Sequence, residues 1–197
     1  MVHIRISDLE QYAKINHVPI MMSDGIEYLL EYIKNNNIKN ILEIGTAIGY
    51  SSIRMAQVNN DIKVTTIERD SNMYNEALKN IKSFNLDNRI NVIYKDALDV
   101  ELNDKYDLIF IDAAKSQYIK FFEKFKHNLN DNGVIITDNL SFHGLVKDST
   151  NCSRNTKQLV KKIQNYIDFL KNNEEFDTGF ISIGDGISIT RKKSNII

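Results

Sequence analysis

The spacing of hydrophobic residues changes twice along this chain. Over the first 36 residues apolar side chains recur at helical intervals, which predicts helices at Asp8–Asn16 and Ser23–Asn35. From Asn40 onward, short apolar runs alternate with helical stretches. Near the C-terminus, the extended runs 176–183 and 187–191 flank Gly184-Asp185-Gly186, a pattern typical of a β-hairpin.

The middle of the chain therefore consists of repeated strand–helix units. The predicted strands are Asn40–Ile44, Lys63–Ile67, Asn91–Tyr94, Leu108–Ile111 and Val134–Thr137, and the predicted helices are Ser51–Val58, Ser71–Phe84, Asn155–Leu170 and one that carries Tyr118, Phe121, Phe122, Phe125 and Leu129. A turn is predicted at Asp131–Gly133. Strands separated by helices form parallel sheets, so we expect an α/β fold: a seven-stranded, mostly parallel sheet with helices on both faces and an antiparallel C-terminal hairpin.

Composition favours one globular domain over residues 1–197. The chain has one proline, eight glycines and 42% apolar residues, and it shows no repeat, linker or low-complexity tract. We found no apolar run near the roughly 20 residues of a membrane span, and no signal-peptide core near the N-terminus. A single cysteine, Cys152, excludes an internal disulfide and fits the reducing cytoplasm.

The charge is balanced overall but not locally. The formal net charge is −1, so the whole molecule is not an electrostatic binder of nucleic acid. Residues 147–171, however, hold six Lys or Arg against two Asp. This segment predicts either a basic binding face or the solvated side of a helix.

Two short segments follow predicted strands and carry candidate chemistry. They are Asp112-Ala-Ala-Lys115 and Asp138-Asn139. The carboxyl ends of parallel strands form the edge of the sheet where ligands bind. Two carboxylates and an amide at this edge offer the oxygen ligands that Mg²⁺ prefers, and Lys115 is close enough in sequence to share the site. The alternative is that the aspartates only cap helices and the asparagine only belongs to a turn.

A glycine-containing turn marks the same edge as a nucleotide-type pocket. Gly45 and Gly49 follow the first strand, where glycine lets the backbone approach a ligand closely. Glu68 ends the second strand, where a carboxylate can accept both hydroxyls of an unphosphorylated ribose, and Asp96 ends the third strand and could face an adenine. The alternative is that Glu68 and Asp96 are capping or loop acids.

Together these segments resemble the cation-dependent O-methyltransferases that use S-adenosylmethionine, a family that includes catechol and caffeoyl-CoA O-methyltransferases. The resemblance rests on Glu43–Ser51, Glu68, Asp112–Lys115 and Asp138-Asn139, and it extends from about His17 to Lys193. Val18–Met21, Ile41–Tyr50, Phe110–Lys115, Gly133–Asn139 and Gly184–Gly186 are similar to the bacterial branch that methylates 5-hydroxyuridine in tRNA. Ser116 stands where a glycine is common in that branch.

The resemblance implies a Rossmann-like methyltransferase fold and a role for each matching residue. The residues implied to bind or border S-adenosylmethionine are Met21, Glu43, Gly45, Gly49, Ser51, Glu68, Asp96, Ala97 and Asp112, with Glu68 on the ribose. Asp112, Asp138 and Asn139 are implied to hold Mg²⁺ or Mn²⁺, and Lys115 is implied to be the general base. The helices within residues 1–36 are expected to cover the pocket, and a homodimer is expected.

The chemistry narrows the acceptor to a hydroxyl with an adjacent oxygen. A metal held by three protein oxygens leaves room for a chelating acceptor, and it lowers the pKa of the attacking hydroxyl. A catechol and the 5-hydroxyl of 5-hydroxyuridine beside its 4-oxo group both meet this need. We expect the tRNA wobble uridine, in the anticodon loop, to be the acceptor. The alternatives are a small catechol-like molecule and a nucleotide-binding module without catalysis. His143, close to Asn139, either reaches the substrate or has no role.

Overall fold

Strands and helices alternate as the sequence predicts, in a computed structural model that describes residues 4–148 and 152–194. Residues 1–3, 149–151 and 195–197 lie outside the described part, including three residues of the predicted basic segment. The helices are α1 (Ile6–Ile15), α2 (Ser23–Asn35), α3 (Tyr50–Gln57), α4 (Ser71–Ser83), α5 (Tyr118–Phe125) and α6 (Arg154–Lys171), with 3₁₀ turns η1 (Ala97–Asp99), η2 (Lys115–Gln117) and η3 (Lys126–Asn128). The strands are β1 (Asn40–Ile44), β2 (Lys63–Glu68), β3 (Ile90–Tyr94), β4 (Tyr106–Ile111), β5 (Leu129–Thr137), β6 (Phe176–Ile181) and β7 (Ile187–Lys192).

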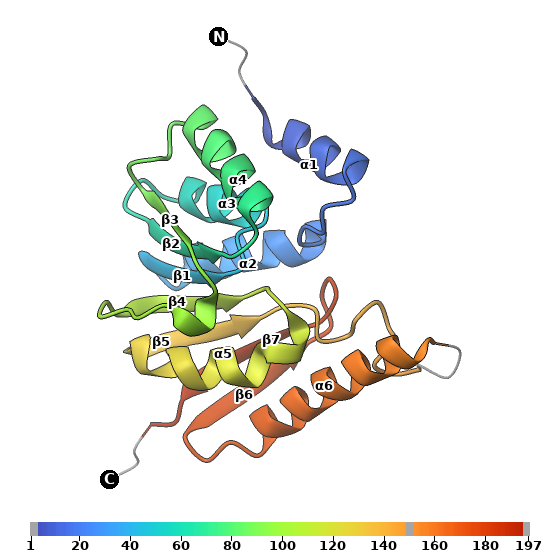
Figure 1. The fold of residues 1–197 in the computed structure, drawn as a ribbon. Coiled ribbons are helices and arrows are strands. Elements are labelled where there is room, and N and C mark those ends of the chain that lie inside the picture. Colours follow the sequence, from blue (N-terminus) through green and yellow to red (C-terminus); the bar gives the residue numbers. More distant parts are fainter. Residues whose placement is uncertain (1–3, 149–151, 195–197) are drawn as a thin grey trace.

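All seven strands belong to one sheet in the order β3–β2–β1–β4–β5–β7–β6 (Figure 1). The pairs from β3 to β5 are parallel, whereas β7 is antiparallel to both β5 and β6. The predicted mostly parallel sheet with a reversed C-terminal strand is confirmed. Because the chain leaves β1 in one direction across the sheet and resumes at β4 on its other side, the carboxyl ends of β1 and β4 flank a crevice suited to a ligand.

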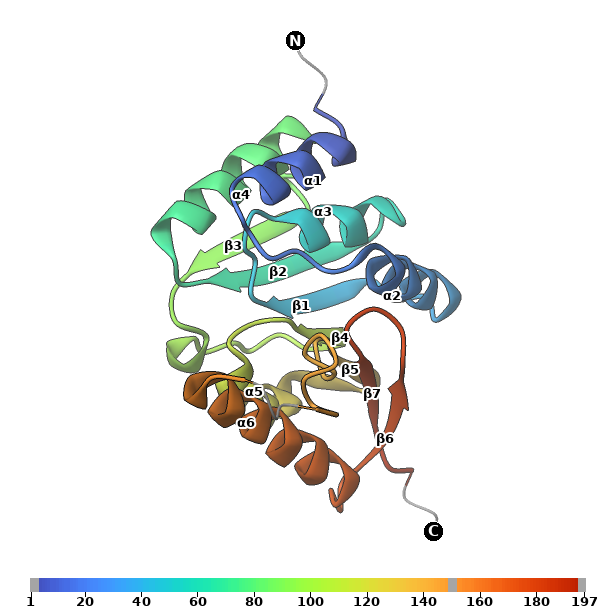
Figure 2. The same cartoon turned by 90° about the vertical axis from the view of Figure 1, so that its right-hand side faces the viewer.

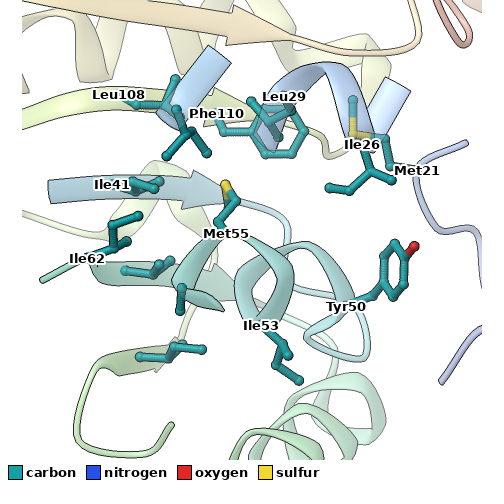
Figure 3. Packing of buried hydrophobic residues seen from close by; sticks show 14 of the residues in the cluster. Met21, Ile26, Leu29, Ile41, Tyr50, Ile53, Met55, Ile62, Leu108 and Phe110 are labelled. Atoms are coloured by element: carbon teal, nitrogen blue, oxygen red, sulfur yellow. The ribbon is translucent and has the colours of Figure 1, made fainter. Parts of the chain in front are cut away.

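Helices cover both faces of the sheet, as Figures 1 and 2 show. Helices α1–α4 pack on one face, and α5 and α6 pack on the other. Alternation within the strands sorts the buried side chains: Leu108 and Phe110 join the core under α1–α4, and Ile109 and Ile111 join the core under α5 and α6. Figure 3 shows part of the first core, where Leu29, Met55 and Phe110 lie between sheet and helices.

An aromatic cluster joins α5, α6 and β6. The ring of Phe122 is fully buried and lies 6.4 Å from that of Tyr166, 5.3 Å from that of Phe169 and 5.3 Å from that of Phe176, in edge-to-face geometry. This is the favourable geometry for aromatic pairs. The aromatic stripe that the sequence shows on α5 is therefore core.

The predicted turn at Asp131–Gly133 is wrong, because these residues lie inside β5. The register between β4 and β5 shifts there: Tyr106 pairs with Leu129, but Leu108 already pairs with Val134. The extra residues bulge from the strand, and the side chain of Asn130 donates a 2.7 Å hydrogen bond to Asp107. Asp-Asn-Gly suits a bulge as well as a turn, so the sequence alone did not separate them.

Within the described ranges, we find no helix with the length and apolar character needed to span a membrane. The helix predicted at Ser23–Asn35 and the strand predicted at Asn40–Ile44 have the predicted bounds, and the other predicted helices and strands agree to within a few residues except at the start of β5.

Candidate functional site

A cavity of about 240 Å³ opens at the carboxyl ends of β1, β2 and β4. The residues predicted to bind cofactor, metal or proton that line it are Met21, Gly45, Ser51, Glu68, Asp96, Ala97, Asp112, Lys115 and Asn139. Glu43, Gly49 and Asp138 are not part of the lining. The direct role of each residue stays a prediction, but the structure brings together segments that lie up to 118 positions apart, from Met21 to Asn139.

The floor of the cavity is the turn after β1. Gly45 has φ +100°, and a β-carbon there would lie 2.2 Å from the carbonyl oxygen of Asp112. Only glycine therefore permits the close approach of β1's turn to the end of β4. The side chain of Asn80, on α4, donates a 2.9 Å hydrogen bond to the carbonyl oxygen of Ile48 and fixes the far side of the turn. Gly49, with φ +82°, precedes α3 and packs against α4 instead of facing the cavity.

Glu68 holds the backbone around the cavity. One carboxylate oxygen accepts the N–H groups of Thr46 and Ala47 at 3.2 and 2.9 Å, and the other accepts those of Arg69 and Asp70 at 2.9 and 2.8 Å. Each oxygen thus already has two donors. A ribose bound at Glu68 would share its oxygens with, or replace, some of these N–H groups.

Asp96 caps a short helical turn and also borders the cavity. One of its oxygens accepts the N–H of Leu98 at 2.9 Å and caps η1, and the other lies 3.3 Å from the guanidinium of Arg69. The residue also lines the cavity beside buried Ala97. An acid in this place can cap a helix and still face a ligand.

Glu43 lies below the cavity, enclosed by hydroxyl groups. Its carboxyl is fully buried on the α3 side of β1 and accepts hydrogen bonds from Ser51, Ser52 and, at 2.6 Å, Thr66. Burial, which outweighs the three hydrogen bonds, raises the pKa of Glu43 to about 7. Glu43 reaches the cavity through Ser51, which lines it. The hydroxyl partners on α3 and β2 had no signal in the sequence.

The residues predicted for metal and proton transfer lie next to one another. Lys115 Nζ donates a hydrogen bond to Asn139 Oδ1, and Asn139 Nδ2 donates one of 2.7 Å to Asp138 Oδ2. The hydroxyl of buried Tyr118 donates to the backbone carbonyl of Asp138 at 3.0 Å and fixes the end of β5. Asp112, at the end of β4, lines the cavity on the other side.

Negative charge accumulates at this point. Burial, and then the charge of Asp112, raises the pKa of Asp138 to about 7, and burial also raises the pKa of Asp112. Asp138 is 1% exposed, and its Oδ1 has no hydrogen-bond partner within the described part of the chain. A buried carboxylate oxygen without a partner is costly unless a cation meets it, so these donors fit a divalent ion. No three Asp, Glu, His or Cys side chains form a metal cluster in the described ranges, because this donor set contains only two acids and an amide.

The segment between α1 and α2 closes the cavity from above. Pro19, Ile20 and Met21 line it, whereas neither helix does. Helix α1 contacts the cavity only through another residue. Its Glu10 accepts a 2.8 Å hydrogen bond from Tyr50, which lines the cavity. In the described part of the chain, the linker borders the cavity and the helices do not, so a cover formed by the helices stays a prediction.

Comparison with known proteins assigns the chain to a family. A family model described as O-methyltransferase matches residues 3–193. A protein of Arabidopsis thaliana named as a caffeoyl-CoA O-methyltransferase is 30% identical, over 96% of this chain and 84% of its own length, and the caffeoyl-CoA O-methyltransferase of Populus kitakamiensis is 28% identical over the same shares. The chain belongs to the O-methyltransferase family.

Solved structures support the same assignment. A Staphylococcus aureus protein described as a caffeoyl-CoA O-methyltransferase is 43% identical, with a TM-score of 0.92 over 96% of this chain and 93% of its own. An O-methyltransferase of Bacillus cereus in complex with S-adenosylhomocysteine (SAH) is 26% identical, with a TM-score of 0.81 over 95% and 90% of the two chains. The protein is an S-adenosylmethionine-dependent O-methyltransferase of the caffeoyl-CoA type with the Rossmann-like fold.

Proposed function

We propose that this protein methylates the 5-hydroxyl of 5-hydroxyuridine at the wobble position of tRNA, with a divalent cation held by Asp112, Asp138 and Asn139. The product is 5-methoxyuridine. The observation that carries the metal-dependent chemistry is the buried Asp138 Oδ1, which has no hydrogen-bond partner among the described residues, beside Asp112, Asn139 and Lys115.

Some of these residues bind the methyl donor, and others act on the methyl acceptor. When bound, S-adenosylmethionine supplies the methyl group, and a Mg²⁺ or Mn²⁺ ion lowers the pKa of the acceptor hydroxyl and fixes its orientation. Glu68 and Asp96 bind the donor's ribose and adenine, and Met21 and Gly45 enclose it. Lys115, as the neutral amine, would accept the acceptor's hydroxyl proton at Nζ and free that oxygen to take the methyl group, while the donor would leave as the neutral thioether S-adenosylhomocysteine. Holding the two reactants in line supplies much of the acceleration.

Exposed lysines on α6, the helix that packs against η2, support an RNA acceptor. Lys157, Lys161 and Lys162 are exposed on α6, and none forms an ion pair with the described acids. Helix α6 lies against η2, which begins with Lys115, and Gln164 donates to the carbonyl oxygen of Val146 in the segment after β5. Lysines in this position can contact phosphates while a base enters the cavity. We expect the anticodon loop to bind there, in a cytoplasmic homodimer.

A small catechol-like acceptor is the second candidate. The relatives named as caffeoyl-CoA O-methyltransferases favour it, and vicinal hydroxyls would chelate the same cation. The overall charge of −1 also gives no general attraction for RNA. Both candidates use the same residues, so only the acceptor distinguishes them.

The deciding experiment supplies both acceptors to the purified protein. Undermodified tRNA and a catechol are each incubated with S-adenosylmethionine, with and without EDTA, and products are measured by mass spectrometry. We expect 5-methoxyuridine in tRNA, its loss in EDTA and its return with Mg²⁺. Asp138→Asn should abolish turnover, and Asp131→Asn, an exposed acid in β5, is the matched control.

Other outcomes decide between the alternatives. Efficient, saturable methylation of catechols without activity on tRNA would replace the proposal by the second candidate. Unchanged 5-methoxyuridine in tRNA from a deletion strain would refute the tRNA role. A module without catalysis would gain support only if Lys115→Ala and Asp138→Ala both left function intact.

A further inference from the structure

A turn from the far end of the chain reaches the site. Gly184-Asp185-Gly186 joins β6 to β7, and both glycines have positive φ, +56° and +84°. Asp185 between them is only 4% exposed, although it lies in a hairpin turn. The proposed mechanism assigns this buried acid no role.

The turn is fastened to the segment that follows the candidate metal residues. Asp185 Oδ1 accepts a hydrogen bond from the backbone N–H of His143, and the carbonyl oxygen of Asp185 accepts the N–H of Ser141 at 2.6 Å. The carbonyl oxygen of Gly186 accepts the N–H of Leu140 at 2.9 Å. A β-carbon on Gly186 would lie 2.9 Å from the backbone nitrogen of Ser141, so the two backbones are in close contact.

The fastened segment has an unusual backbone. Asn139, Phe142 and His143 have φ values of +66°, +46° and +54°, a region that residues with side chains rarely adopt. Such conformations persist only where surrounding contacts determine them. The contacts made by Asp185 and Gly186 reach Leu140, Ser141 and His143, which lie between or within these unusual positions.

This segment carries two side chains that meet the candidate base. Asn139 Oδ1 accepts the hydrogen bond from Lys115 Nζ, and the Phe142 ring centroid lies 5.8 Å from the same nitrogen. If the backbone from 139 to 143 relaxed, both groups would move relative to Lys115.

We propose that Asp185 is a positioning residue that holds Phe142 and His143, and through them Asn139, in their left-handed conformations and thereby sets Asn139 and Phe142 around Lys115. The hydrogen bond that Asp185 Oδ1 accepts from the His143 N–H carries this role. The catalytic part of the inference rests on the proposed function of Lys115 and Asn139. The conformational part does not.

The test compares two substitutions that separate the hydrogen bond from the charge. Asp185→Asn keeps an oxygen that can accept the His143 N–H and removes the charge, whereas Asp185→Ala removes both. Asp177→Asn, an exposed acid in β6 of the same hairpin, is the matched control. Turnover, KM for the acceptor and SAH affinity are measured for each, together with hydrogen exchange of the peptide that contains residues 140–146.

We expect Asp185→Ala to lower kcat by about tenfold to a hundredfold, while SAH affinity changes by less than about twofold. Asp185→Asn should recover most of the turnover, and only Asp185→Ala should show faster exchange at 140–146. Equal losses of turnover in both variants would overturn the proposal in favour of a charge effect. Exchange at 140–146 in Asp185→Ala that is no faster than in wild type would also overturn it.

The exchange measurement keeps this inference separate from the proposed function. It needs no acceptor, so it still tests the hold on residues 139–143 if neither tRNA nor catechol is methylated, an outcome that would defeat the proposed function alone. Where Asp185→Ala does not fold, fast exchange in folded Asp185→Asn would by itself overturn the proposal.

Discussion

At the scale of single residues, Glu43 is a motif residue whose carboxyl lies outside the lining of the cavity. The motif suggested an acid at the edge of the pocket, yet the structure buries its carboxyl among Ser51, Ser52 and Thr66. These contacts tie β1 to α3 and β2 and place the Ser51 hydroxyl. A carboxyl in such surroundings should make the stability of the protein depend on pH.

Replacement of Glu43 by Gln should flatten that dependence. Because burial raises the folded-state pKa from 4.5 to about 7, the stabilisation is present below pH 4.5 and is lost as the pH rises through 7. Wild-type protein should therefore lose up to about 3 kcal/mol over this range through Glu43, a loss that Glu43→Gln should not show. Urea unfolding at several pH values measures it.

The free energy of unfolding of Glu43→Gln should still fall somewhat as the pH rises, because the pKa of Asp138 is also raised. Glu31→Gln, at an exposed position on α2, is the matched control and should follow the wild-type curve. Parallel curves for wild type and Glu43→Gln would contradict the prediction.

At the scale of elements, local pattern predicted most of the fold and part of the site. Period-two and helical spacing placed the strands and helices, and the edge rule placed Asp112, Asp138 and Lys115 together. The sequence did not predict the β5 bulge at 131–133, because its residues suit a turn equally well. The sequence also did not predict that Asp185 lies near the site, because its hydrogen-bond partner His143 is 42 positions away. Hydrogen bonds between distant segments leave no periodic signal in one sequence.

The aromatic cluster of α5 and α6 should be a main source of stability. Phe122→Ala removes a fully buried ring that contacts three others, and it should cost about 3–5 kcal/mol. Phe180→Ala, which removes a ring 41% exposed on β6, should cost about 1 kcal/mol or less. Chemical denaturation gives both values, and similar costs would show that α5 is not held by this core.

At the scale of the whole molecule, contacts within the chain itself determine the shape of the cavity. The Gly45 approach to Asp112, the four N–H groups on Glu68 and the Asn80 contact with Ile48 fix its floor from three elements. A cavity formed in this way loses little conformational entropy on binding.

SAH should therefore stabilise the whole fold without an acceptor. At a concentration one hundred times its Kd, it should add about 2.7 kcal/mol, or about 5–10 °C in Tm for a domain of this size. Differential scanning calorimetry with and without SAH measures the shift. Glu68→Gln should shrink it at the same SAH concentration, and an unchanged shift in that variant would remove Glu68 from the donor site.

The β6–β7 turn holds residues 139–143, whereas β1 and β2 form the floor of the cavity. This separation also bears on how a new acceptor specificity could arise. Phe142 and Asn139 lie against Lys115, whereas Gly45 and Glu68 shape the floor of the cavity, so substitutions at Phe142 would change the surroundings of Lys115 and leave that floor intact. An ancestral enzyme could in this way change its methyl acceptor through a few substitutions, provided that Asp185 was kept and still held the segment 139–143.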